Sequence, residues 1–390
     1  MNTPDPIRIL ASAEAAPRIR AALSRRAFLG ALGAFGTAGA LAACAAPGGG
    51  SNAGDGTIED TLAMYTWGDY DSPDVLEQFQ ADNSVRMTVD SFGSNEELIA
   101  KLTSSRGTSG YDIVVPTGVY IAEMVNAGLL EKLNLDLIPN IQHVSPEFLK
   151  QPWDPNNEYS ICKSWGTTGF VYDKQAIGRE LKTWDDFFDA AMNEASGKTS
   201  MLDDPQGIIG CYFWSKGYST NDNNAAHFDE AETFLVEQLA PHISTFDSYP
   251  GSGGIVQGTQ MLFQAWNNDA RLGIMESGDP ERWAWSGGGP ESELWMDNWA
   301  IAAGAKSPNA AHAFINFVLD PEIAFQQMEY VGSDTGAIGQ RELAEEAGVE
   351  YPDMIFFSAE QVANLKPVEV TESQDRFVDI WNKMKARAAQ

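Results

Sequence analysis

The sequence predicts an α/β protein, with enough chain for two lobes of ordinary domain size. The length of 390 residues allows two hydrophobic cores. A content of 43% hydrophobic and 21% charged residues is typical of a soluble globular protein. From residue 62 onward, short apolar strands alternate with amphipathic helices. Such alternation predicts parallel or mixed sheets covered by helices.

The first strand–helix units follow directly from the apolar pattern. Residues 62–67, LAMYTW, are mostly apolar and predict a buried strand. Ser72, followed by proline, begins a helix, and residues 85–89 alternate apolar and polar side chains as a half-buried strand does. Ser94 and Glu97 have the spacing of a capping box ahead of the next helix. The later predicted elements are strands at 113–116, 165–172 and 301–303, and helices at 119–126, after Thr183, after Ser307 and through 377–384.

The amino-terminal segment is a targeting signal. Residues 24–30, SRRAFLG, match a twin-arginine export signature, and the apolar run that follows is too short and too weakly hydrophobic for a membrane span. That run ends in Leu-Ala-Ala-Cys44, which matches the lipobox of bacterial lipoproteins. We therefore predict a signal peptide over residues 1–43, lipidation of Cys44 and a flexible tether over 44–60. The protein would be exported by the twin-arginine route and lipid-anchored in the periplasm or at the cell-surface side of the cytoplasmic membrane.

Two further cysteines, Cys162 and Cys211, lie in the exported part. Export makes a disulfide chemically possible, but the sequence does not give their separation. A disulfide and two buried free thiols therefore both stay open.

Composition and motifs exclude several classes of function. The net charge of −30 argues against nucleic acid as a partner, and it either serves solubility or attracts cationic ligands. The sequence has no G-x-S-x-G, H-E-x-x-H, Walker or C-x-x-C motif. The four histidines are scattered along the chain, at His143, His227, His242 and His312. We predict no enzyme activity, no metal and no cofactor.

Carboxylates next to aromatic residues are the distinctive chemical feature. They occur at 67–70 (WGDY), 266–269 (WNND) and 295–297 (WMD), with a further acidic pair at 203–204. An aromatic face attracts an organic cation by about 0.5–2 kcal/mol, and a buried carboxylate adds to this attraction. The alternative for any one of these runs is that the tryptophan belongs to the core and the aspartate caps a helix. Together they favour a binding site for an ammonium group.

These runs stand among longer motifs that carry a family resemblance. The motifs are YTWGDY at 65–70, LEQF at 76–79, YDIVVP at 111–116, PWDPNNEYS at 152–160, WGTTG at 165–169 and WMD at 295–297. In these motifs and in their order the chain resembles the bacterial periplasmic spermidine/putrescine-binding proteins, the extracellular solute-binding proteins of polyamine ABC transporters. The resemblance extends from residue 62 to about residue 385.

The resemblance implies a type II periplasmic-binding-protein fold. In that fold two lobes, each a mixed sheet flanked by helices, are joined by a hinge and close over a ligand between them. Lobe 1 would comprise residues 62–165 and 296–340, and lobe 2 residues 166–295 and 341–390. Clefts between lobes are common ligand sites, and hinge closure is the usual response to the ligand.

The resemblance also implies eight ligand-binding residues: Trp67, Asp69, Tyr70, Thr117, Asp204, Trp266, Trp295 and Asp297. Asp297 would be the main anchor of one ammonium end, and Asp204 would contact an amine. Trp266 and Trp295 would hold the methylene chain between their rings.

The remaining positions would complete the opposite wall. Trp67 and Tyr70 would line it, with Asp69 near a ligand amine. Thr117 matches a small hydroxyl residue of the family's site, and Gln374 corresponds to a polar contact near the carboxyl terminus.

Several positions depart from the family pattern. Gly207 stands where a glutamate is expected, and Ser333 where an aromatic residue is expected. An aromatic residue expected near Val119 is lost or replaced by Tyr120, and Lys163 adds a positive charge that would oppose a polyamine. The missing carboxylate at Gly207 leads to the hypothesis that a shorter diamine, an acetylated polyamine or another amine is preferred over spermidine.

The resulting prediction is a monomeric substrate-binding receptor of an ABC importer. It would capture a putrescine- or spermidine-like polyamine and pass it to an inner-membrane permease driven by an ATPase. The alternatives are a binding protein for another small amine or an amino acid, and a sensory binding protein of the same fold. An enzyme on this fold would need a nucleophile–base pair or a metal cluster, and the sequence offers neither.

Overall fold

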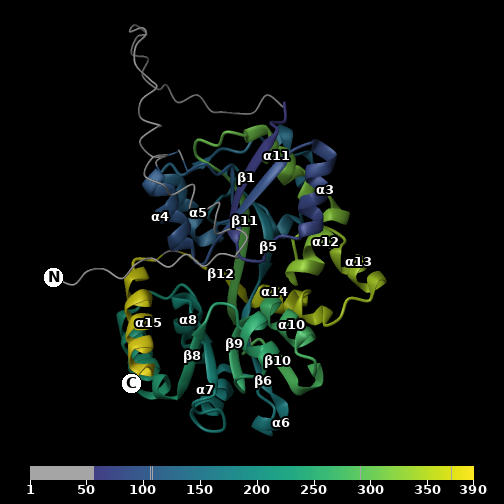
Figure 1. Cartoon of the computed structure of the whole chain (residues 1–390). Helices are drawn as coiled ribbons and strands as arrows, with labels where there is room; N and C mark the ends of the chain where they lie inside the picture. The colour runs from purple at the N-terminus through teal and green to yellow at the C-terminus, as the bar shows by residue number, and fades with distance from the viewer. Residues whose placement is uncertain (1–56, 106, 108, 290, 370) are drawn as a thin grey trace, which may run out of the picture. The chain divides into compact units, whose positions relative to one another are not determined.

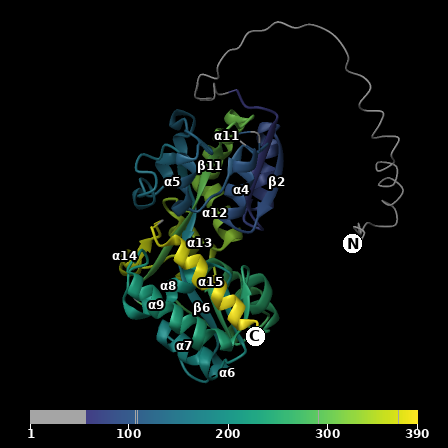
Figure 2. The ribbon, with the colours of Figure 1, turned by 90° about the vertical axis from the view of Figure 1, so that its left-hand side faces the viewer.

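A computed structural model describes residues 57–105, 107, 109–289, 291–369 and 371–390 (Figures 1 and 2). The predicted signal peptide over residues 1–43, Cys44 and the tether up to residue 56 lie outside the described residues. Within the described part, no helix combines the length and the hydropathy that crossing a membrane requires.

Helices and strands alternate along most of the chain, as the sequence predicts. The strands are β1 (Thr61–Trp67), β2 (Arg86–Phe92), β3 (Ile113–Val114), β4 (Leu130–Glu131), β5 (Ser160–Gly166), β6 (Thr168–Asp173), β7 (Thr199–Leu202), β8 (Ile243–Asp247), β9 (Leu262–Trp266), β10 (Trp283–Ser286), β11 (Ser292–Ala302) and β12 (Leu365–Pro367). The α-helices are α3 (Pro73–Asn83), α4 (Asn95–Ser105), α5 (Gly118–Asn126), α6 (Lys174–Ile177), α7 (Trp184–Met192), α8 (Pro205–Lys216), α9 (Ala225–Glu232), α10 (Asn267–Glu276), α11 (Pro308–Val318), α12 (Pro321–Val331), α13 (Gln340–Ala347), α14 (Ala359–Asn364) and α15 (Gln374–Ala388).

The strands form two mixed sheets. In the first sheet the order is β12-β11-β3-β1-β2, and β4 and β5 also pair with β11. Strands β1, β2 and β3 are parallel, whereas β11 is antiparallel to β3, β4 and β5. In the second sheet the order is β10-β6-β9-β7-β8. Helices flank both sheets, so the predicted fold class, two mixed sheets flanked by helices, is confirmed (Figure 1).

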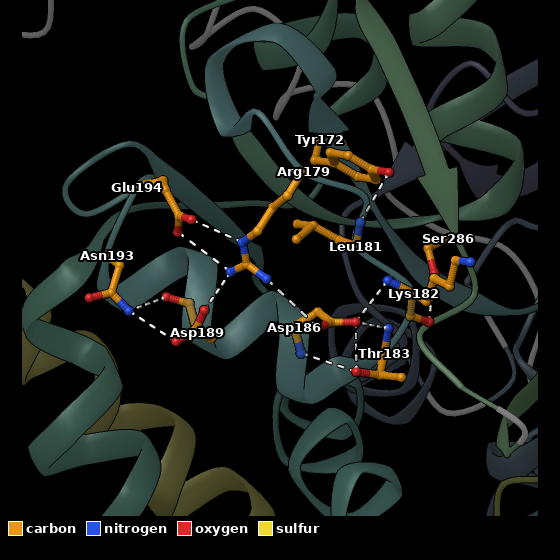
Figure 3. Close-up of polar contacts among 10 residues, drawn as sticks. All are labelled: Tyr172, Arg179, Leu181, Lys182, Thr183, Asp186, Asp189, Asn193, Glu194 and Ser286. Carbon is orange, nitrogen blue, oxygen red and sulfur yellow. Dashed lines mark hydrogen bonds and ion pairs between the residues drawn. The ribbon is translucent and has the colours of Figure 1, made fainter.

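Local sequence determines where many helices begin and end. Helix α3 begins at Pro73 and ends where Ser84 adopts a left-handed conformation with φ 54°. Helix α7 begins with a capping box in which Thr183 accepts from the Asp186 amide and Asp186 accepts from the Thr183 amide (Figure 3). Arg179 then bridges to carboxylates of this helix and to Glu194 on its carboxyl-terminal side.

Two adjacent strand segments link the sheets. β5 belongs to the first sheet, and after Thr167 the chain continues directly into β6 of the second. β11 pairs with β5 along most of its length, and Ser292 at its start bonds the Thr168 carbonyl. The sequence had predicted only residues 301–303 of this strand, because charged and polar residues interrupt its apolar run. The predicted lobe boundaries at 165/166 and 295/296 fall in these linking strands, and the lobes as separate moving units stay a prediction.

Each sheet has a hydrophobic core of its own. The core of the first sheet includes Met64, Phe79 and Phe314, and that of the second includes Phe187 and Phe213. Helix α15 packs against α8 in the second core, as Figure 2 shows.

The two cysteines lie in different cores. Cys162 belongs to the core of the first sheet and Cys211 to that of the second, and both are buried free thiols. Burial raises the pKa of each thiol. Of the two alternatives left open by the sequence, the disulfide is therefore wrong.

Candidate functional site

Strand β11 supplies the central part of the site. Side chains along a strand alternate between its two faces, so Glu293, Trp295 and Asp297 share one face. Leu294 and Met296 point the other way, into the core of the first sheet. The apolar face holds the strand in place, and the opposite face presents two carboxyl groups with an indole ring between them.

Asp297 is buried and held by a hydroxyl group. Thr117, at the start of α5, donates from Oγ1 to Asp297 Oδ1 at 2.7 Å. Thr117 is itself fixed by Asn95 of α4, whose side chain bonds both the Thr117 hydroxyl and its amide at 3.0 Å. Burial raises the pKa of Asp297 to about 6, and the Thr117 hydrogen bond and the nearby charge of Lys163 oppose that rise.

Tyr70 adjoins Asp297 and covers the buried cation Lys163. Lys163 Nζ lies 4.3 Å from the Tyr70 ring centroid and donates to the Tyr70 carbonyl at 2.7 Å. It also pairs with Asp71 at 2.8 Å, and both side chains are 2% exposed. Lys163 is therefore already neutralised, which weakens the expectation that it repels a cationic ligand. Burial, followed by the charge of Asp297, raises the pKa of Tyr70.

A second acidic group lies at the amino terminus of α8. Asp204 is the N-cap of this helix, where its Oδ2 accepts from the Gly207 amide at 2.6 Å. Glu293 is buried, and its Oε1 accepts from the Thr168 hydroxyl. Burial and the charge of Asp204 raise the pKa of Glu293 to about 8, and burial raises that of Asp204 to about 6.

Residues of helices α4 and α5 interact electrostatically with Asp204. Glu96 of α4 accepts a hydrogen bond from Tyr120 of α5 at 2.8 Å. The charge of Glu96 contributes to the raised pKa of Asp204, and Asp204 in turn contributes to the raised pKa of Tyr120. These interactions bring helices packed on the two sheets together at one place.

The three predicted tryptophans lie on three different strands. Trp295 packs on Gly166, where an added Cβ would lie 2.4 Å from the ring, so only glycine fits. Trp266 ends β9 opposite Thr168, the residue that bonds Glu293. Trp67 is half-buried at the end of β1, and its ring centroid lies 4.7 Å from that of Phe92.

The structure does not bring every predicted residue to the same place. Asp69 is exposed in the turn after β1, with φ 52°, and makes no ion pair among the described residues. Gln374 accepts from Gln206 at 2.9 Å, at the start of α15 and beside α8. Direct bonds or electrostatic contacts therefore unite Tyr70, Thr117 and Asp297 at one end of the site and Asp204 with Glu293 at the other.

The sequence analysis missed Glu293. The signal was present, since Glu293 lies two residues before Trp295 and four before Asp297 on a strand of period two. The departure at Ser333 also has a local account. Ser333 is fully buried and lies 2.6 Å from the Ser164 hydroxyl, oxygen to oxygen, so a small polar pair occupies that place.

The predicted site residues do not line the groove or form a metal cluster in the described part of the chain. A groove of about 710 Å³ lies among α3, α11 and the turns near residues 136–140, and none of the predicted site residues lines it. In the described part of the chain, no three histidine, cysteine, aspartate or glutamate side chains are grouped as a metal site would require.

Comparisons with known proteins show to which family the chain belongs. Residues 74–352 match the family described as bacterial extracellular solute-binding protein. The chain belongs to this family. The spermidine/putrescine-binding periplasmic protein of Salmonella typhimurium is 29% identical over 343 residues, which cover 86% of this chain and 95% of that protein. The corresponding protein of Escherichia coli K12 is 30% identical over 295 residues, covering 75% and 82%.

A solved structure agrees with this membership. The spermidine/putrescine ABC transporter substrate-binding protein of Streptococcus pneumoniae superposes with a TM-score of 0.72 at 28% identity. The match covers 85% of this chain and all of that one. The resemblance to spermidine/putrescine-binding proteins that the motifs predict is thereby confirmed.

Proposed function

We propose that this solute-binding protein is the receptor of an ABC importer and captures a putrescine- or spermidine-like polyamine between its two lobes. The observation that carries the proposal is Asp297, a carboxyl group 9% exposed that forms no ion pair among the described residues. It stands on the same strand face as Trp295, and next to Tyr70. A buried carboxylate without a counter-charge is costly, and an ammonium ligand supplies that charge.

The aromatic residues suit the rest of such a ligand. The methylene chain of a polyamine is apolar and stacks on indole faces, while the ammonium groups are attracted to the electron-rich rings. Trp67, Trp266 and Trp295 are each half-buried and offer such faces. The relatives named as spermidine/putrescine-binding proteins support the same ligand class.

The alternative of an amino-acid ligand is less well supported. An amino acid brings a carboxylate that needs a cationic partner. Lys163 is a cation whose charge acts on Asp297, and its ammonium already bonds Asp71 and the Tyr70 carbonyl. We therefore favour a ligand that carries positive charge only.

The remaining parts of the proposal rest on the amino-terminal motifs and on the resemblance to transport receptors. The protein would be exported by the twin-arginine route and anchored through Cys44. As a monomer without catalytic activity, it would deliver its ligand to an inner-membrane permease.

A thermal-shift screen of the purified protein tests the ligand class. A ligand that binds only the folded state raises the melting temperature. We expect putrescine or spermidine to raise it and γ-aminobutyrate to leave it nearly unchanged. A shift with γ-aminobutyrate but with no polyamine would overturn the proposal.

A further inference from the structure

Glu293 is a buried carboxyl group that lacks a cation. Its side chain belongs to a residue 4% exposed, and the Thr168 hydroxyl donates to one of its oxygens. No hydrogen bond reaches the other oxygen, Oε2, and no lysine or arginine pairs with the group, in the part of the chain that the structure describes. Such burial without a counter-charge destabilises the folded protein unless a proton or a ligand cation is present.

Thr168, which donates to Glu293, connects this residue to Asp204 through the second sheet. Thr168 and Trp266 are register partners on β6 and β9, so their side chains lie on one face of the second sheet. Gln264 shares that face, two residues before Trp266, and bonds the Gly207 carbonyl in the first turn of α8. This face of the sheet therefore meets the helix end that Asp204 caps, and the two carboxyl groups repel each other there.

This arrangement changes how the glycine at position 207 is interpreted. The sequence comparison suggested that a carboxylate is missing beside Asp204, because glycine replaces the expected glutamate. A Cβ at Gly207 would lie 3.0 Å from Asp204 Oδ2, so this position is close to the capping carboxylate. Glu293 brings a carboxyl group to the same helix end from a strand instead of from α8.

We propose that Glu293 is a specificity-determining residue, which together with Asp204 binds the second ammonium group of a ligand whose first ammonium group is held by Asp297. This inference rests on the proposed function. Glu293 and Asp297 are four residues apart on an extended strand, so their Cα atoms are separated by about 13 Å, with Trp295 between them. The site thus selects linear dications, and an acetylated, singly charged polyamine is a poor ligand. The earlier argument from Gly207 for an acetylated polyamine loses its premise.

Binding of the second ammonium group is coupled to a proton. Glu293 faces Asp204, the N-cap of α8, and Cys211 within that helix, and Asp204 faces Glu96 and Tyr120 from α4 and α5. Burial and the surrounding acidic or neutral groups keep a proton on Glu293 at neutral pH. An ammonium group between the two carboxyls favours their ionised forms, and the proton on Glu293 is released to the solvent.

Isothermal titration calorimetry of the purified protein tests the proposal with putrescine and N-acetylputrescine. We expect E293Q to weaken putrescine binding about 10- to 100-fold and to change N-acetylputrescine binding much less. E281Q is the matched control, because Glu281 is a 92% exposed carboxylate near the second sheet. E293Q affinity for putrescine equal to that of E281Q and wild type would overturn the proposal.

A measurement on the unmodified protein guards against a variant that fails to fold. Titrations at pH 7 in buffers of different ionisation enthalpy give the number of protons released. We expect release of about one proton per putrescine bound, and no release overturns the inference. If the unmodified protein binds no amine at all, the proposed function itself fails, and the inference fails with it.

Discussion

The two ends of the face presented by β11 handle buried negative charge differently. At one end Asp297 has a hydroxyl donor, Thr117, and the buried cation Lys163 nearby. At the other end Glu293 has a single hydroxyl donor and faces a second carboxyl group, Asp204. The pKa is raised to about 6 at Asp297 and to about 8 at Glu293, so at neutral pH the first is mostly ionised and the second mostly protonated. One end is thus ready for an ammonium group, whereas the other must first lose a proton.

The largest expected effect comes from removing the cation behind the Asp297 end. Lys163→Met leaves Asp71 buried without its partner, and breaking such a pair costs about 3–5 kcal/mol of unfolding free energy. Urea denaturation measures the loss. The double variant Lys163→Met with Asp71→Leu should recover part of it, because no charge is then left unpaired. A loss below about 1 kcal/mol in the single variant would contradict the assignment of a buried ion pair.

The next largest effect is expected at the anchor itself. Asp297→Asn keeps the shape of the side chain but removes the charge that an ammonium group needs, and should weaken putrescine binding by about 2–5 kcal/mol. Titration by intrinsic tryptophan fluorescence measures it, with Glu281→Gln as the surface control. Unchanged affinity would remove Asp297 from the site.

A further effect should distinguish Glu293 from Asp297 by the pH dependence of stability. The pKa of Glu293 in the folded state, about 8, exceeds its value of about 4.3 in the unfolded chain, so the folded state holds a proton that the unfolded chain has released. Stability therefore falls as pH rises between these two values. Glu293→Gln cannot ionise, so its melting temperature relative to wild type should be higher at pH 8 than at pH 5. The same difference at both pH values would show that Glu293 does not titrate in this range.

The smallest effect is expected for an exposed ion-pair cluster. Arg179 bridges Asp186, Asp189 and Glu194 (Figure 3), but its side chain is 33% exposed. Solvent screens such pairs, so Arg179→Ala should cost less than about 1 kcal/mol of unfolding free energy. A loss of unfolding free energy as large as that of Lys163→Met would contradict the distinction between buried and exposed charges.

The fold followed from local patterns. The alternation of apolar strands and capped helices predicted parallel or mixed sheets covered by helices, the resemblance implied two of them, and Thr183 predicted the start of α7. These signals lie within a few residues of each other, so a single sequence contains them. Strand β11 was found only at its end, because its site face carries charged residues that break the apolar run.

The sequence indicated candidate site residues where the relevant side chains stand close together along the chain. Trp295 and Asp297 are two positions apart, and the structure gives Asp297 its predicted neighbours Tyr70 and Thr117. Glu293 meets Asp204, and Lys163 meets Asp71, only through tertiary packing of segments about ninety residues apart. The neutralisation of Lys163 and the position of Glu293 beside Asp204 therefore could not be derived from spacing along the chain.

Calorimetric titration of the purified protein at pH 7.5 with putrescine, and with 1,4-butanediol as a neutral ligand of the same carbon chain, tests the central claim most directly. The account predicts saturable binding of one putrescine with a dissociation constant of about 1 μM or lower, and no measurable binding of the diol. Equal binding of both ligands, or binding of neither putrescine nor spermidine, would contradict it.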